Sequence, residues 1–129
     1  MRYLLDTHAL FWWVYFPELL PPGVRDILAN PDVRVFASAV SAYEMSYKHH
    51  RGRRPEVEPL VGAFDAVVAA EGFDLLPLSA VHAIRAGSYG PEHRDPFDRM
   101  LAAQAVVEGL TLVSKDEAIR EMGADLVWE

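Results

Sequence analysis

Two aspartates stand three residues apart in the segment HRDPFDR, residues 93–99. Asp95 directly precedes Pro96, and Asp98 follows two positions after the proline. An Asp-Pro pair is a common helix start, because the carboxylate caps free backbone N–H groups and proline needs no hydrogen bond at the first helical position. Two carboxylates at this spacing would also suit a metal ion. The segment alone leaves both interpretations open.

Other acidic residues stand close to the ends of apolar runs. Asp6 ends RYLLD, Asp116 follows LTLVSK, and Glu44 lies one or two turns into the helix expected after VRVFAS. In an open parallel sheet, functional groups gather outside the carboxyl ends of the strands. We therefore expect Asp6, Glu44, Asp116 and the pair Asp95 and Asp98 to reach one edge of a sheet.

Each acid also has an ordinary structural interpretation. Asp6, Asp95 and Asp116 are placed to cap helices, which stabilises a helix by about 1 kcal/mol. Asp98 is at the third helical position, where the helix dipole favours an acid by about 0.3–1 kcal/mol. However, carboxylates from several segments at one edge would repel one another unless a cation joined them. Hard cations such as Mg²⁺ or Mn²⁺ prefer such oxygen ligands.

The elements that must position these acids alternate between strand and helix. Strands are expected at 2–6, 33–38, 73–78, 110–114 and 124–128, and helices at 7–15, 22–30, 38–50, 60–72, 79–87, 95–109 and 115–123. Thr7 is the expected cap of the first helix. This alternation predicts an α/β fold, with a parallel sheet flanked by helices on both faces and one domain over residues 1–129.

The composition excludes several classes of protein. There is no cysteine, so disulfides and thiolate zinc sites are excluded, and the five histidines lack zinc-binding spacing. The absence of cysteine permits a reducing cytoplasm, and we expect a cytoplasmic protein. We expect no membrane contact, since no uncharged stretch reaches the roughly 18 residues that a span requires. The net charge of −7 argues against nucleic-acid binding by bulk attraction.

One segment is positively charged although the chain as a whole is negatively charged. KHHRGRR, residues 48–54, contains Lys48, Arg51, Arg53 and Arg54. These residues are candidates for RNA contact, as is Arg99, although cations also suit the end of a helix.

The apolar run FWWVYF, residues 11–16, fills both sides of its expected helix. Its second side is a candidate surface for a partner protein.

The chain resembles PIN domains, and more narrowly VapC-type toxin ribonucleases of type II toxin–antitoxin systems. The matching pieces are LLDTHALFWW, SAVSAYEMSYKHHRGR, HRDPFDRMLAAQAVVEGLTLVSKD and the closing LVW. The resemblance implies a PIN-like fold and an endoribonuclease that depends on Mg²⁺ or Mn²⁺. It also implies a homodimer that a small cognate antitoxin neutralises.

Carried over by motif, the family's acids match Asp6, Glu44, Asp98 and Asp116, and Asp95 matches an extra acid of a subgroup. Asp6, Asp98, Asp116 and Asp95 would hold the metal. Glu44 would orient or deprotonate the attacking water. Ser114, which stands where the family often has threonine, would support a metal ligand by a hydrogen bond.

Two other functions match parts of the sequence. A catalytically inactive PIN-like module that binds RNA or protein is the main alternative. A receiver domain needs an acid pair after its first strand and a phosphoacceptor aspartate after its middle strand. Here DTH follows the first strand and FDLLPLS has no acid at the end of the third, so the receiver pattern is not met.

Overall fold

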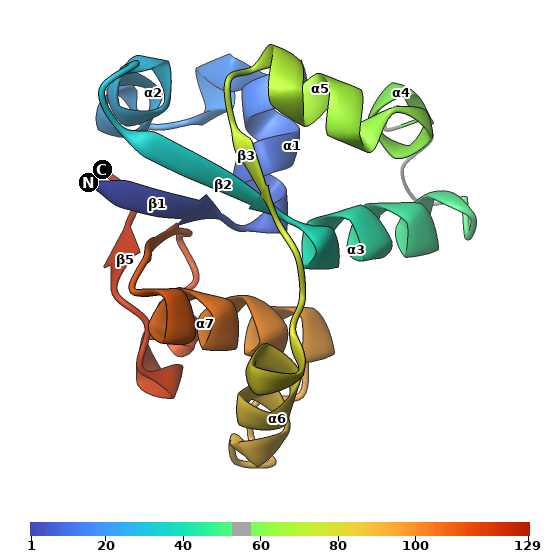
Figure 1. Cartoon of the computed structure of the whole chain (residues 1–129), viewed down its shortest axis with the longest axis vertical. Coiled ribbons are helices and arrows are strands. Elements are labelled where there is room, and N and C mark those ends of the chain that lie inside the picture. Colours follow the sequence, from blue (N-terminus) through green and yellow to red (C-terminus); the bar gives the residue numbers. More distant parts are fainter. Residues whose placement is uncertain (53–57) are drawn as a thin grey trace.

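The computed structural model describes residues 1–52 and 58–129, apart from the side chains of residues 58 and 59. Five parallel strands form one sheet in the order β3-β2-β1-β4-β5 (Figure 1). The strands are β1 (Arg2–Leu5), β2 (Arg34–Ser38), β3 (Asp74–Leu76), β4 (Thr111–Val113) and β5 (Leu126–Val127). The predicted α/β class with a parallel sheet is confirmed.

Strand β1 lies at the centre of the sheet and is buried on both faces. Leu4 pairs with Phe36 on β2 and with Leu112 on β4. Successive side chains of a strand point to opposite faces. Tyr3 and Leu5 accordingly belong to one core cluster, whereas Leu4 belongs to another.

Helices cover both faces of the sheet (Figure 1). They are α1 (Thr7–Tyr15), α2 (Pro22–Ala29), α3 (Ala39–His49), α4 (Glu58–Gly62), α5 (Phe64–Ala70), α6 (Ala80–Ser88) and α7 (Pro96–Glu108), with 3-10 helices η1 (Pro17–Leu19) and η3 (Glu117–Met122). Leu10, Val24 and Val68 pack with Leu5 on one face. Helices α7 and η3 fill the opposite core around Leu4. Within the described ranges, no helix has the length and apolarity that crossing a membrane requires.

Two expected helices differ in the structure. The single helix expected over 60–72 is divided into α4 and α5, because Ala63 has φ −144° and ψ 44°, outside the helical region. Gly62 immediately precedes the break, and glycine weakens a helix interior. Residues 117–122 form a 3-10 helix, which ends where Gly123 adopts a φ of 98°.

The run FWWVYF packs mostly against the protein's own core. Phe11 is buried, Trp12 and Trp13 are partly buried against the core, and only 39% of Phe16 is exposed. Larger exposed fractions occur on α6, at Val81 and Ile84. The structure therefore leaves little of this run as the partner surface that the sequence suggested.

The site-bearing segments meet at one edge of the sheet. Strands β1, β2 and β4 are parallel, so their carboxyl ends lie together, and α1, α3 and η3 follow directly from them. Helix α7 starts on the same side, beside α3 (Figure 1). The N-terminus lies at the other end of β1, where that strand begins.

Candidate active site

Asp6 is buried where β1 passes into α1. Its backbone N–H donates to the Val113 carbonyl at 3.1 Å, and its Oδ1 accepts from the backbone N–H of Ala9 at 2.7 Å. Asp6 therefore caps α1, and the expectation that Thr7 is the cap was wrong. Burial raises the pKa of Asp6 above its ordinary value, while a hydrogen bond with Ser114 acts in the opposite direction.

Glu44 is buried on α3 and has a partner at each carboxylate oxygen. Thr7 Oγ1 donates to Oε1 at 2.6 Å, and Lys48 Nζ donates to Oε2 at 2.5 Å. The Thr7 hydroxyl has a single proton, so Ser41 Oγ must donate to it across their 3.0 Å contact. Residues of α1 and α3 together fix the position of Glu44.

Asp95 and Asp98 have different roles at the start of α7. Asp95 Oδ1 accepts from the backbone N–H groups of Phe97 at 2.8 Å and Asp98 at 3.3 Å, which is a helix cap. The carboxylate of Asp98 is partly buried. Burial, followed by the charge of Asp95, raises the pKa of Asp98 from 3.8 to about 7, and the charges of Asp116, Glu44 and Asp6 add to the rise.

Asp116 caps η3 through its side chain. Its Oδ1 accepts from the backbone N–H of Ala118 at 3.0 Å, and its own N–H donates to Ser114 Oγ at 3.1 Å. Ser114 is 1% exposed and also bonds to Asp6. This serine thus connects the acids that follow β1 and β4.

The structure brings every predicted acid into one pocket of about 460 Å³. We call it the acid pocket, and it is lined by Asp6, Thr7, His8, Glu44, Lys48, Asp95, Asp98, Lys115 and Asp116. Its five acidic residues outnumber its two lysines. One lysine, Lys48, is paired with Glu44, and Lys115 lies 4.9 Å from the centre of the Trp12 ring.

The donor set of the acid pocket fits a hard divalent cation. Its donors are carboxylate oxygens from separate segments, and the excess negative charge is what such a cation offsets. Nevertheless, in the part of the chain that the structure describes, no three acidic, histidine or cysteine side chains are already grouped as a metal site. The carboxylates of Asp6, Asp95 and Asp116 instead accept helix-cap hydrogen bonds. A bound cation would bring carboxylate oxygens of this pocket closer together than they stand here.

The candidate RNA-contact residues are placed differently from one another. Lys48 lines the acid pocket, and Arg51 is exposed at the end of α3. Arg53 and Arg54 lie outside the described residues. The Arg99 guanidinium donates to the backbone carbonyls of Ala86, Gly87, Tyr89, Gly90 and His93. These bonds order the segment between α6 and α7 and occupy the donors that a contact of Arg99 with RNA would use.

Sequence reasoning missed part of the support around Glu44. Thr7 and Ser41 contact one another although they are 34 positions apart. No pattern of neighbouring residues in the sequence indicates such a contact. Lys48 was considered only for RNA, although a glutamate four residues before a lysine on a helix commonly forms an ion pair. That spacing was the available sign of the Glu44–Lys48 contact.

Comparison with known proteins agrees with the fold. The PIN domain model matches residues 3–125, and the chain belongs to the PIN domain family. It is 26% identical to Ribonuclease VapC22 of Mycobacterium tuberculosis over 118 residues, which covers 91% of this chain and 88% of that protein.

Solved structures share the fold at lower identity. A chain of VapBC2 from Rickettsia felis, bound to a DNA fragment from its promoter, matches with a TM-score of 0.72 and 18% identity over 100% of both chains. A chain of FitAcB from Neisseria gonorrhoeae matches with a TM-score of 0.64 and 19% identity, covering 96% of this chain and 95% of that one. A toxin–antitoxin complex from Klebsiella pneumoniae matches with a TM-score of 0.61 and 16% identity, covering 96% of this chain and 94% of that one.

Proposed function

We propose that this protein is a metal-dependent endoribonuclease that acts as the toxin of a toxin–antitoxin pair. The observation that carries the proposal is the acid pocket, which collects five acidic residues at the carboxyl edge of a PIN-domain sheet. The similarity to a protein named as a ribonuclease supports RNA as the substrate. A structural relative that is a toxin–antitoxin complex supports a small cognate antitoxin as the partner.

Asp6, Asp98 and Asp116, with Asp95, are the proposed ligands of Mg²⁺ or Mn²⁺. When bound, such a cation lowers the pKa of a coordinated water and offsets charge on the attacked phosphate. Ser114 orients Asp6 through its hydrogen bond. The helix caps made by Asp95 and Asp116 fix the backbone from which these carboxylates reach the pocket.

Glu44 is the proposed proton acceptor. Its carboxylate is held between Thr7 and Lys48, so its direction is fixed before RNA arrives. The water oxygen attacks phosphorus, its proton passes to Glu44, and the bond from phosphorus to the leaving sugar oxygen breaks as that oxygen takes a proton from solvent water. Lys48 is placed to contact a phosphate oxygen at the same time.

The remaining properties of the proposal come from the resemblance and from the substrate. A homodimer is proposed from the resemblance alone. An RNA substrate implies that the protein works in the cytoplasm. A binding module without catalysis is the competing function, because no metal group is preassembled among the described residues.

Cleavage of an unstructured RNA by the purified protein tests the proposal. We expect cleavage with Mg²⁺ or Mn²⁺ and none in EDTA. Asp98→Asn should lower the rate by more than the roughly 10–100-fold that loss of an outer-shell partner costs. The matched control is Asp26→Asn, which changes an exposed acid on α2 and should leave the rate unchanged.

Two results would count against the proposal. Full activity in Asp98→Asn would remove the acid pocket from the mechanism. Tight RNA binding without cleavage, at any concentration of either cation, would establish the binding module instead.

A further inference from the structure

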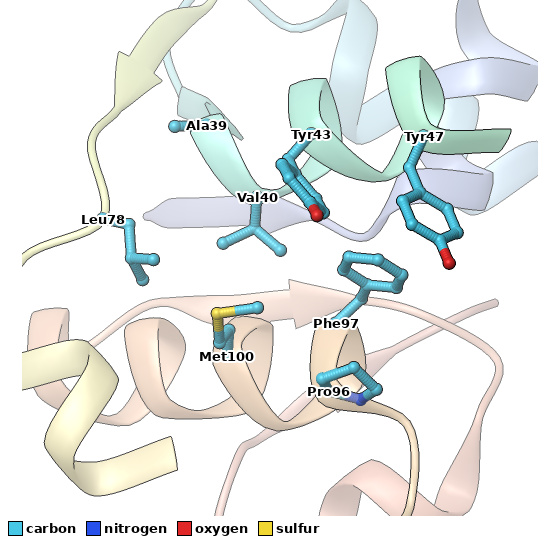
Figure 2. Close-up of a pocket in the computed structure, with 8 residues that line it drawn as sticks. All are labelled: Ala39, Val40, Tyr43, Tyr47, Leu78, Pro96, Phe97 and Met100. Carbon is cyan, nitrogen blue, oxygen red and sulfur yellow. The ribbon is translucent and has the colours of Figure 1, made fainter. Parts of the chain in front are cut away.

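A second pocket, of about 700 Å³, lies between α3 and the start of α7. Figure 2 shows Tyr43 and Tyr47 reaching from α3 toward Phe97 on α7, with Val40 and Met100 farther along the same groove. We call this pocket the aromatic groove. Its volume is within the roughly 300–1,000 Å³ of small-molecule sites.

The rings of the aromatic groove are unusually accessible. Tyr43 is 60% exposed and Tyr47 is 39% exposed. The two tyrosine rings are stacked with centres 6.0 Å apart, and the Phe97 ring lies 5.8 Å from Tyr43 and 6.3 Å from Tyr47. Exposed, clustered aromatic rings offer faces on which a flat ligand can stack.

The aromatic groove and the acid pocket are built on the same two helices. Tyr43 directly precedes Glu44 on α3, and Phe97 directly precedes Asp98 on α7. Consecutive residues of a helix point in directions about 100° apart, since a turn takes 3.6 residues. On each helix the acid thus lies on one face and the ring lies on the adjacent face. A polymer held in the acid pocket has the aromatic groove beside it.

Cations stand where this groove approaches the acid pocket. The Arg51 guanidinium lies 3.5 Å from the centre of the Tyr47 ring, and its Nη1 donates to the Tyr47 carbonyl at 3.0 Å. Lys48 lies on the same helix and lines the acid pocket. Rings flanked by cations suit a ligand made of bases and phosphates.

We propose that the aromatic groove receives one unpaired base of single-stranded RNA, in the nucleotide next to the cleaved bond. The base stacks on Tyr43 and Phe97, while Arg51 and Lys48 face the neighbouring phosphates. This inference rests on the proposed ribonuclease function and adds a base-binding subsite to it. Stacking on aromatic side chains is a general means by which proteins hold unpaired RNA bases.

A second exposed apolar surface shows why a base fits the groove better than a protein does. Val81, Ile84 and Val107 on α6 and α7 form a shallow, mainly aliphatic surface that Arg85 and Ser88 also line. That surface has no aromatic ring among its lining residues, and none of them stands next to an acid-pocket residue in the chain, as Tyr43 and Phe97 do. A mainly aliphatic surface suits protein contacts, whereas the groove combines clustered rings with direct continuity to the acids.

The test uses RNA oligonucleotides that carry a single 2-aminopurine at successive positions. The fluorescence of this base falls when it stacks. Rapid mixing with excess protein in Mg²⁺ records the fluorescence first and the cleavage afterwards. For the wild-type protein we expect quenching at one position, adjacent to the cleaved bond.

The variants separate ring stacking from other roles. Tyr43→Leu should lose the quenching and bind RNA about 10-fold more weakly. Tyr43→Phe retains the ring and should behave like the wild type. The matched control is Phe16→Leu, which removes a ring with the same 39% exposure as Tyr47 at a site outside both pockets. Thermal melting confirms that each variant is folded.

The outcomes distinguish this inference from the proposed function. Wild-type protein that neither binds nor cleaves RNA would overturn both. Wild-type cleavage together with unchanged quenching and affinity in Tyr43→Leu would overturn the base subsite alone. A change of oligomeric state in Tyr43→Leu, with RNA binding retained, would assign the groove to a second copy of the chain and also overturn the subsite.

Discussion

Asp98 is the acid of the pocket whose negative charge is least compensated. Asp6, Asp95 and Asp116 accept backbone N–H groups, and Glu44 is paired with Lys48. None of the causes that shift the pKa of Asp98 is a hydrogen bond within the described part of the chain, and each of them raises it. A carboxylate in this position disfavours the cation-free fold and favours cation binding.

Replacement of Asp98 should therefore stabilise the protein in EDTA. The pKa of Asp98 is about 7 in the folded protein and 3.8 for an unperturbed aspartate, so the folded state binds the proton more tightly. The folded protein therefore loses stability as the pH rises from 3.8 to about 7. The full difference corresponds to about 4 kcal/mol. Partial exposure reduces it, and we expect Asp98→Asn to add about 2 kcal/mol to the free energy of unfolding at pH 8.

Urea unfolding in EDTA at pH 8 and at pH 4 measures this effect. The gain from Asp98→Asn should almost vanish at pH 4, where the folded state already carries the proton. Asp26→Asn should change stability by less than about 0.5 kcal/mol at either pH. A loss of stability at pH 8, or an equal gain at both values, would contradict the assigned electrostatics.

The residues of the acid pocket show what a sequence can predict at this scale. Asp6, Glu44 and Asp116 were placed correctly because each follows an apolar strand, and parallel strands end at one edge. The contact of Thr7 with Glu44 was not predictable, since it joins α1 to α3 across 37 positions. The sequence offered both Asp6 and Thr7 as caps of the first helix, because both side chains are good caps, and in the structure Asp6 is the cap.

At the scale of elements, one side chain fixes the relative positions of α3 and α7. Gln104 is fully buried on α7, where its Oε1 accepts from Ser38 Oγ at 2.6 Å and its Nε2 donates to the Pro77 carbonyl at 3.2 Å. Ser38 Oγ also accepts from the N–H of Val40 and so caps α3. This connection sets the distance between the helices that carry Glu44 and Asp98.

Gln104→Leu should lower the free energy of unfolding by about 1–3 kcal/mol, because the buried Ser38 hydroxyl loses its acceptor and the Pro77 carbonyl loses its donor. Denaturant unfolding of Gln104→Leu, Ser38→Ala and the double variant measures the coupling between them. We expect the double variant to lose less than the sum of the single losses, by about 1 kcal/mol. Strict additivity would show that the contact contributes nothing.

Arg99 provides a second prediction for elements, and Arg51 is its matched control. Arg99→Gln should lower the free energy of unfolding by about 2–3 kcal/mol, since the guanidinium bonds to backbone carbonyls between α6 and α7. It should leave the salt dependence of RNA binding unchanged. Arg51→Gln should do the reverse and reduce the salt slope by about 1. A reduced slope in Arg99→Gln would restore its assignment to RNA.

The order of the strands shows the limit of pattern reasoning. Alternating strands and helices predicted a parallel sheet, but several strand orders satisfy the same pattern. The observed order places β1 between β2 and β4. This order depends on which apolar faces of the helices and strands pack together. The division of α4 from α5 at Ala63 is a similar case, because the residues on both sides favour helix when they are considered locally.

For the whole molecule, the chemistry is concentrated on one side. The acid pocket and the aromatic groove both lie beside α3 and the start of α7, while the N-terminus lies at the opposite end of β1 (Figure 1). A net charge of −7 would repel RNA from most of the surface. Arg51, Lys48 and a cation bound among the acids would make this side the favourable approach.

The central claim is that the acid pocket holds the divalent cation on which cleavage depends. A crystal grown with Mn²⁺ and measured for anomalous scattering locates the cation directly. We expect one strong peak in the acid pocket, contacted by Asp98 and by carboxylates that follow β1 and β4. An acid pocket without a peak, in a crystal where Mn²⁺ occupies another site on the protein, would contradict it.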